Sequence, residues 1–298
     1  MEDFFYLASI AMNAISLELA AKRDCLLELL RSYGSCAVAY SGGLDSTVLA
    51  KAAQLALGDR AVAVTGVSAS LAVGELDQCK EIARQIGIRH DVIQTGELAV
   101  PEYLANTPDR CYHCKTELFL QVEKLAARLG VAVIVDGSNR DDHGEHRPGL
   151  RAARERKVSS PLAECAFTKA DIRALAVFWE LPVWNKPATP CLSSRIAYGE
   201  PVTPERLAMI DAAERFLRAE GFGPLRVRYH RGDMARIEVA LGALEKFTEP
   251  SFRRKLVEKL KSLGFKYVAL DLEGFRSGSL NAVLPPESLQ IQRRAADR

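Results

Sequence analysis

The chain has 298 residues, of which 48% are hydrophobic, and its formal net charge is +2. This apolar content is enough for a sizeable core, and the length predicts one large and one small domain. A domain that holds a long nucleic acid usually has a pI above about 9 and clustered Lys and Arg, whereas the sequence pI here is about 8.1. We therefore expect a small anionic partner and no nucleic acid.

The N-terminal segment and the cysteine count bear on localisation. The first residues are acidic and lack the basic region of a signal peptide, and no run approaches 18 apolar residues. We expect a cytoplasmic protein that binds no membrane. Seven cysteines, an odd number, favour thiol, metal or catalytic roles over a disulfide framework.

The first half of the sequence alternates apolar runs with helical patterns. A parallel sheet covered on both faces is the expected result. A capping box, Thr168 with Asp171, opens a later helix that ends at Phe178. Strands are predicted at 36–40, 61–67, 90–94 and 131–135, and helices at 14–32, 46–57, 75–86 and 115–129.

An irregular, proline-rich stretch from Leu181 to Glu200 follows, and segments of this length are usually functional. We place a domain boundary at about residue 200. The fold class is thus α/β, an open parallel sheet with helices on both faces in 1–200, followed by a small α+β domain in 201–298. In the second domain, helices are predicted at 204–220 and 251–263, and strands at 225–229, 235–240 and 266–270.

The segment Ser41-Gly42-Gly43-Leu44-Asp45-Ser46 lies between a predicted strand and a predicted helix. Two glycines permit close backbone approach to an anion, two serines add hydroxyl donors, and the helix N-terminus adds unpaired N–H groups. The segment is not a Walker loop, which needs a lysine. It resembles the pyrophosphate loop of ATP pyrophosphatases, which cleave ATP between the α- and β-phosphates.

Acidic residues accompany this loop. Asp45 is expected near the Mg²⁺ that accompanies ATP, because hard cations prefer oxygen ligands. A second loop, 136–142, follows the fourth predicted strand and falls at the same edge of the sheet. Its Asn139, Asp141 and Asp142 either line the nucleotide pocket or shape a turn, and Arg147 continues the same edge.

Three cysteines stand out by their surroundings. Cys111 and Cys114 form a C-x-x-C just before a predicted helix, and Cys191 lies in a proline-bounded loop with Arg195. A closed zinc site needs four ligands, whereas three thiolates suit an iron–sulfur cluster with one open iron. Redox-active or sacrificial thiols without metal are the main alternative, and a structural zinc site that recruits His113, or no role at all, stays open. A nearby Arg195 favours the thiolate of Cys191. The other cysteines are interpreted as small apolar core residues: Cys25, Cys36, Cys79 and Cys165.

Alternation in the second domain places cationic side chains together. Period two puts Arg226, Arg228 and His230 on one face of a strand, and Arg236 and Glu238 share a face of the next. If these strands pair as a hairpin, the patch is suited to bind phosphate. A solvated sheet face is the alternative.

Together these motifs resemble the LarE-type family of ATP-dependent sulfur insertases, which help to build the nickel-pincer nucleotide cofactor of lactate racemase. The resemblance covers nearly the whole chain. Besides the pyrophosphate loop, it is carried by Arg110–Lys115, Gly137–Asp142, Arg147–Gly149, Ser159–Leu162, Pro190–Arg195 and Arg226–Arg228.

The resemblance implies that ATP adenylylates a carboxylate of pyridinium-3,5-biscarboxylic acid mononucleotide and that a sulfur nucleophile then displaces AMP. It assigns ATP binding to Ser41, Gly42, Gly43, Asp45, Ser46, Asn139 and Asp142. It assigns substrate phosphate to Arg226, Arg228 and Glu238, and catalysis to Cys191, Asp45 and Arg195. It further implies a homo-oligomer, either a trimer or a hexamer.

Family members differ in their sulfur source. Those with only the equivalent of Cys191 sacrifice its sulfur, whereas those with all three cysteines hold a 4Fe-4S cluster that carries an extra sulfide. This sequence has Cys111, Cys114 and Cys191, so cluster ligation by all three is expected, with sacrifice of Cys191 as the alternative.

Three other functions compete with this interpretation. A tRNA thiolation enzyme would share the pyrophosphate loop but needs a basic RNA-binding module. A non-enzymatic adenine-nucleotide-binding module would bind ATP without releasing pyrophosphate. An ammonia-using enzyme of the same superfamily would need no cysteine cluster, so this function would not explain Cys111 and Cys114.

Overall fold

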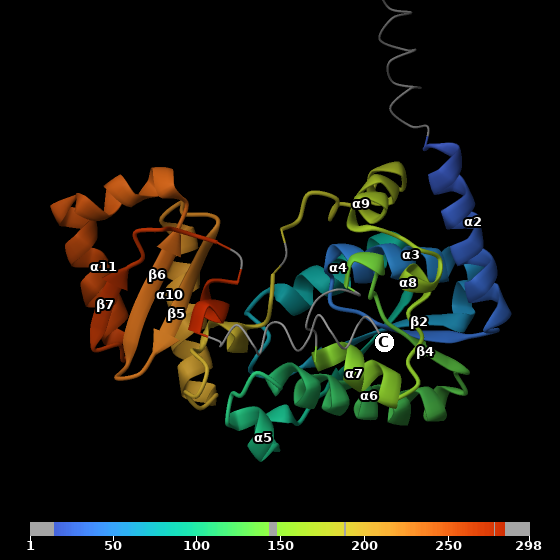
Figure 1. Cartoon of the computed structure of the whole chain (residues 1–298), viewed down its shortest axis with the longest axis horizontal. Coiled ribbons are helices and arrows are strands. Elements are labelled where there is room, and N and C mark those ends of the chain that lie inside the picture. Colours follow the sequence, from blue (N-terminus) through green and yellow to red (C-terminus); the bar gives the residue numbers. More distant parts are fainter. Residues whose placement is uncertain (1–14, 143–147, 188, 277, 284–298) are drawn as a thin grey trace, which may run out of the picture. The chain divides into compact units, whose positions relative to one another are not determined.

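The computed structural model describes residues 15–142, 148–187, 189–276 and 278–283 (Figure 1). They form two compact units. The described residues of unit 1 fall within 15–67, 74–95 and 115–189, and those of unit 2 within 68–73, 96–114 and 190–283. The assignment of 1–200 and 201–298 as domains with separate functions stays a prediction, because these units describe packing alone.

Unit 1 is built on a four-stranded parallel sheet in the order β3-β2-β1-β4. The strands are β1 (Cys36–Ala39), β2 (Ala61–Val67), β3 (Arg89–Gln94) and β4 (Val133–Val135). β1 lies inside the sheet and all four of its residues are buried. A strand buried on both faces requires an unbroken apolar run, which explains the Cys-Ala-Val-Ala sequence.

Alternate residues of the strands face two helical layers, so helices cover both faces of the sheet. Cys36 and Val38 join a core with the helix α3 (Leu44–Leu57). Ala37 joins a separate core with Val122 of α6 (Arg110–Leu129). This division follows from the period of two along a strand, and it confirms the α/β class predicted for this part of the chain.

Three other helices of unit 1 begin or end at signals that the sequence shows. The hydroxyl of Ser16 accepts the Leu19 N–H at the start of α2 (Leu17–Ser32), and the predicted capping box opens α9 (Lys169–Phe178). α4 (Glu75–Ile86) ends at Gly87 in the left-handed region. Two short helices, α7 (Pro148–Glu155) and α8 (Pro161–Glu164), were not predicted.

Unit 2 contains a three-stranded sheet in the order β5-β6-β7. β5 (Leu225–His230) pairs antiparallel with β6 (Met234–Val239), which confirms the predicted hairpin, and β6 pairs parallel with β7 (Tyr267–Leu270). Inward residues of these strands share one core with α10 (Pro204–Ala219) and α11 (Pro250–Ser262). The short segment α5 (Pro101–Leu104) adds Tyr103 to this core.

Two local predictions were wrong. The C-x-x-C does not precede a helix: α6 begins at Arg110, because the carbonyls of Thr107 and Asp109 accept the first N–H groups. Cys111 and Cys114 therefore lie within the first five residues of this helix. Cys25 is exposed rather than part of the core. No described helix is long and apolar enough to cross a membrane.

Candidate functional site

The pyrophosphate-type loop connects β1 to α3 and contains a glycine that the fold requires. Gly42 has φ +64°, a conformation that side chains disfavour, and a Cβ there would lie 2.7 Å from the Sγ of Cys79. Gly43 is the N-cap of α3 and no side chain caps this helix end. The backbone N–H groups at the start of α3 therefore face the loop rather than a capping side chain.

The two serines of the loop are bonded to each other and to its backbone. The Ser46 hydroxyl accepts the Ser41 N–H at 3.2 Å, donates to the Gly43 carbonyl at 3.2 Å and lies 3.1 Å from the Ser41 hydroxyl. These bonds hold the loop in a closed turn before any ligand binds. The cradle is thereby preorganised, which lowers the cost of binding an anion.

Asp45, predicted to lie near Mg²⁺, is held by a lysine. The Lys169 Nζ contacts both carboxylate oxygens, at 2.6 Å from Oδ1. Lys169 is the first residue of α9, and its backbone N–H donates to the Asp141 carboxylate at 2.7 Å. Both partners of the ion pair remain partly exposed, Asp45 at 26% and Lys169 at 41%, so a ligand can reach them.

The loop after β4 lies against the start of α3, as predicted from the shared sheet edge. A Cβ on Gly137 would come within 3.0 Å of the Ser46 nitrogen. Asn139 and Asp142 are buried and bonded to each other, since the Asn139 N–H donates to the Asp142 carboxylate at 3.0 Å. These two side chains shape the turn, and their contact with ATP stays a prediction. Arg147 lies outside the described residues.

A second lysine, Lys186, contacts the pyrophosphate-type loop from the irregular 181–187 segment. Its Nζ donates to the Gly42 carbonyl at 3.3 Å and lies 3.4 Å from the Glu75 carboxylate. The same side chain lines a cavity of about 700 Å³ beside α4, whose walls include Gln78 and Val183. Two cations thus contact the loop region of unit 1, one at Asp45 and one at Gly42.

The three cysteines of interest all belong to unit 2 and share electrostatic neighbours. Burial alone would lower the pKa of Arg110, but the thiols of Cys191 and Cys111 raise it above its usual value. Burial raises the pKa of Tyr103, and Cys191 and Cys114 raise it further. Arg110 and Tyr103 therefore each interact electrostatically with two of the thiols, and together they interact with all three.

Arg110 and Tyr103 are also tied to the loop that carries Cys191. The Tyr103 hydroxyl lies 2.5 Å from the Ser193 hydroxyl, and the Arg110 Nη1 donates to the Ser193 carbonyl at 2.8 Å. A further bond from Arg110 reaches Asn106, which is fully buried. These contacts fix the Cys191 loop relative to the N-terminal end of α6, where Cys111 and Cys114 lie.

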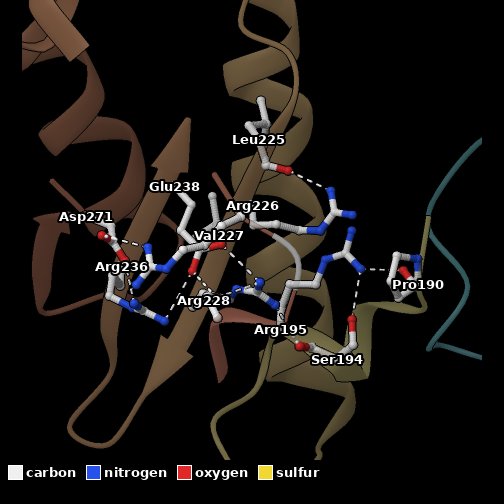
Figure 2. A network of polar contacts seen from close by, with 12 residues as sticks. Pro190, Ser194, Arg195, Leu225, Arg226, Val227, Arg228, Arg236, Glu238 and Asp271 are labelled. Atoms are coloured by element: carbon white, nitrogen blue, oxygen red, sulfur yellow. Dashed lines mark hydrogen bonds and ion pairs between the residues drawn. The ribbon is translucent and has the colours of Figure 1, made fainter. Parts of the chain in front are cut away.

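Arg195 positions the same loop through its backbone. Its guanidinium is 1% exposed and donates to the Cys191 carbonyl at 3.0 Å and to the Pro190 carbonyl, as Figure 2 shows for Pro190. The other side of the guanidinium pairs with Glu214, which is fully buried, at 3.0 Å. The catalytic role expected of Arg195 stays a prediction, and the geometry makes it a positioning residue.

The side chains of the described residues bear on which kind of metal group the cysteines could hold. Among the residues that the structure describes, no group of three His, Cys, Asp or Glu side chains is arranged to hold a single ion. A zinc ion needs its ligands within about 2.3 Å of one point. A four-iron cluster spreads its thiolate ligands more widely, so an exposed Cys111 and Cys191 with the half-buried Cys114 suit the cluster by number and type.

The paired strands β5 and β6 bring together the predicted arginine patch (Figure 2). Glu238 is fully buried and bonds Arg228 at 3.0 Å and Arg236 at 3.2 Å. Arg228 also donates to the Ser194 carbonyl at 2.9 Å, next to the Cys191 loop. Glu238 thus orients the guanidinium groups, and its predicted contact with substrate stays untested.

This patch carries more positive charge than its own carboxylates balance. Burial, together with the charges of Arg195 and Arg228, lowers the pKa of Arg226 to about 10. The buried Nε of Arg228 has no hydrogen-bond partner within the described parts of the chain. An anion bound here would accept such hydrogen bonds and offset the repulsion among the three guanidinium groups.

The sequence assigns no role to several of these residues: Lys169, Lys186, Tyr103 and Glu214. Arg110 enters there only as part of the Arg110–Lys115 motif of the family resemblance. Only Lys169 had a local signal, its place directly after the capping-box Thr168, and that signal marks a helix start and not a ligand site. The contacts that reveal these residues join segments far apart in sequence.

No protein-family model matches the chain. It is 44% identical to an uncharacterised protein of Synechocystis over 89% of this chain and 99% of that protein. It is 38% identical to the pyridinium-3,5-bisthiocarboxylic acid mononucleotide synthase of Lactiplantibacillus plantarum over 91% and 98%. A weaker match, 28% identity, covers 61% of this chain and 39% of a GMP synthase of Aeropyrum pernix. On the strength of the 38% match over almost the full length of both proteins, the chain belongs to the LarE-type family of the pyridinium-3,5-bisthiocarboxylic acid mononucleotide synthase.

Proposed function

We propose that this enzyme uses ATP to replace carboxylate oxygen by sulfur on pyridinium-3,5-biscarboxylic acid mononucleotide, giving the bisthiocarboxylate precursor of the nickel-pincer nucleotide. The observation that supports the proposal is that three thiols surround Arg110 and Tyr103 in a chain that also has a pyrophosphate-type loop. A nucleotide-binding module alone would need the loop but not the thiols.

The first step activates the substrate. A carboxylate oxygen of the substrate attacks the α-phosphorus of ATP, the bond from this phosphorus to the bridging oxygen breaks, and pyrophosphate leaves. The N–H groups at the start of α3 and the Ser41 and Ser46 hydroxyls would bind the phosphates, and Lys169 and Lys186 would balance their charge. The product is a mixed anhydride, whose leaving group is AMP.

Asp45 would hold the Mg²⁺ that accompanies ATP, which supplies positive charge at the phosphate oxygens. The carboxylate fits this role because it is partly exposed and charged beside Lys169. When Asp45 binds the ion, Lys169 becomes available to contact a phosphate. The Lys169–Asp45 pair therefore keeps two oppositely charged binding groups in place before ATP binds.

The arginine patch would bind the substrate's own phosphate. Arg226 and Arg228 offer guanidinium donors in an environment that repels further positive charge, and Glu238 holds Arg228 in place. An arginine can bind phosphate through two parallel N–H donors, which a lysine in the same place could not do. A homo-oligomer, trimer or hexamer, belongs to the proposal and would be measured as the solution mass of the protein.

The second step delivers sulfur to the acyl carbon, and AMP leaves as the carbon–oxygen bond breaks. Cys111, Cys114 and Cys191 would hold a 4Fe-4S cluster, which when bound would supply the sulfide for this step. Arg195, Arg110 and Tyr103 fix the Cys191 loop through hydrogen bonds to Cys191 and Ser193.

Pyrophosphate release tests this proposal. The anaerobically purified protein is incubated with Mg-ATP alone, with the pyridinium dicarboxylate nucleotide, or with bulk tRNA, and products are separated by mass spectrometry. We expect pyrophosphate, AMP and a thiocarboxylate only with the pyridinium nucleotide. Stimulation by tRNA instead would support tRNA thiolation, and ATP binding without any pyrophosphate would support a regulatory module. Either result contradicts the proposal.

A further inference from the structure

Two cysteines outside the proposed reaction lie in contact although 140 positions separate them. The Sγ atoms of Cys25 and Cys165 are 2.6 Å apart, and both residues belong to unit 1. Cys25 is on α2, and Cys165 follows the last residue of α8. Both are free thiols in this structure.

The two thiols differ in their surroundings. Cys25 is exposed, whereas Cys165 is 5% exposed in the core that also contains Leu162 and Phe167. Burial, together with the neighbouring Cys25, raises the pKa of Cys165 to about 12. Cys165 therefore stays protonated at neutral pH, and Cys25 is the thiol that a soluble oxidant meets first.

The backbone around the pair holds the two sulfurs together in the reduced protein. The Cys165 N–H donates to the Pro161 carbonyl at 3.0 Å, which closes the turn of α8. α2 packs directly against α8 and against α3. Oxidation therefore needs no large conformational change, because the two sulfur atoms that would be bonded are already in contact.

We propose that Cys25 and Cys165 are an oxidation site that closes to an intramolecular disulfide in the presence of a peroxide. The Cys25 thiolate attacks one peroxide oxygen, the oxygen–oxygen bond breaks, and hydroxide leaves, so that Cys25 becomes a sulfenic acid. The Cys165 sulfur then attacks the Cys25 sulfur, the sulfur–oxygen bond breaks, and the Cys165 proton leaves with the oxygen as water. Two thiols are oxidised and the peroxide is reduced to water.

The disulfide would tie the N-terminal helix of unit 1 to the segment before α9. α2 packs on α3, whose first turn carries Asp45, and Lys169 begins α9 shortly after Cys165. Because the bridge closes a loop of more than 100 residues, it restricts the unfolded chain strongly. We expect the thermal unfolding midpoint to rise by roughly 10 °C on oxidation.

Peptide mapping tests the site directly. The protein is treated with one equivalent of hydrogen peroxide, free thiols are blocked with iodoacetamide, and the digest with trypsin is analysed before and after dithiothreitol. We expect the peptide 24–31 joined to the peptide 158–169 through Cys25 and Cys165, and separation of the two by the reductant. Recovery of both peptides as separate alkylated species would overturn the proposal, as would a sulfinic acid at Cys25 or its linkage to another peptide.

Variants make the assignment specific. Cys25→Ser changes an exposed residue and is expected to fold, to give no joined peptide, and to lose the thermal shift on oxidation. A triple variant, Cys111→Ser with Cys114→Ser and Cys191→Ser, removes the other exposed or half-exposed thiols. It is expected to keep both the joined peptide and the thermal shift on oxidation. A thermal shift that persists in Cys25→Ser, or disappears in the triple variant, would contradict the assignment.

Discussion

Lys169 and Asp45 form an ion pair across 124 positions of sequence, with the Lys169 Nζ 2.6 Å from the Asp45 Oδ1. The pair lies at the first turn of α3 and the first residue of α9. It joins the carboxylate proposed for Mg²⁺ to a cation that no motif in the sequence had suggested. The proposed nucleotide site thus has an acidic and a basic group that Mg-ATP would separate on binding.

Replacing this lysine tests its part in ATP use. Lys169→Ala is expected to lower kcat/KM for ATP roughly 100-fold, because one fixed charge at the phosphates is lost. The matched control is Lys124→Ala, whose Nζ bonds Gln121 on an exposed helix face, and its kinetics should equal those of the wild type. Equal kinetics for both variants would remove Lys169 from the site.

Gly42 is expected to resist substitution for two separable reasons. Gly34 also has a positive φ but has no atom within 4 Å of an added Cβ, so Gly34→Ala measures the backbone penalty, about 1–2 kcal/mol. Gly42→Ala should cost at least about 1 kcal/mol more, because its Cβ meets the Cys79 Sγ. Chemical denaturation gives both values.

The Cys79 contact is then removed to test the second reason. In a double-mutant cycle, Cys79→Ala is expected to recover most of the extra cost of Gly42→Ala. Additive effects of the two substitutions would show that the close contact with Cys79 does not determine the need for glycine.

The buried pair of Arg195 and Glu214 is expected to dominate the stability of the Cys191 loop. Glu214→Ala leaves the guanidinium of Arg195 buried without its counter-charge and should lower the free energy of unfolding by about 3–5 kcal/mol. Arg215→Ala, which breaks the partly exposed pair with Asp211, should cost under about 1 kcal/mol. A similar loss for both variants would contradict the role given to the buried pair.

His230 makes stability depend on pH. Burial lowers the pKa of its imidazole, and the charges of Arg236 and Arg228 lower it further. The neutral ring also accepts a hydrogen bond from the Arg236 Nε at 3.1 Å. The unfolded chain therefore binds the proton more readily than the folded one, and stability falls as pH decreases below the unfolded value of about 6.5.

Glutamine at this position keeps an acceptor but does not titrate. His230→Gln should therefore show a smaller loss of unfolding free energy between pH 7 and pH 5 than the wild type does. Urea titrations at each pH give the slopes. An unchanged slope would mean that His230 does not contribute to the acid sensitivity.

The sequence was sufficient for features that depend on neighbouring residues. The apolar runs predicted the parallel sheet, the capping box predicted α9, and alternation predicted that Arg226 and Arg228 share a face. Each of these patterns is set by local geometry, with a period of two in strands or a hydroxyl at a helix start.

Features that join distant segments could not be predicted in this way. In the sequence, Glu214 does not differ from other residues of its amphipathic helix, and only the structure shows that it pairs with Arg195, which holds the Cys191 loop. Cys25 was assigned to the core because cysteine is usually buried, whereas its position on α2 leaves it exposed beside Cys165. Single-sequence patterns carry no information about such pairings.

Three cysteines of one chain are proposed to hold the sulfur-delivering centre, and the iron and sulfide content of the protein is the most direct test of this proposal. The protein is purified without oxygen, and iron and acid-labile sulfide are measured in the wild type, in Cys111→Ala, Cys114→Ala and Cys191→Ala, and in Cys25→Ala as the matched control. We predict about four irons per chain in the wild type and the control, with loss in each of the other three variants. A wild type without iron, whose intact mass after turnover has fallen by one H₂S, would show instead that Cys191 gives up its own sulfur.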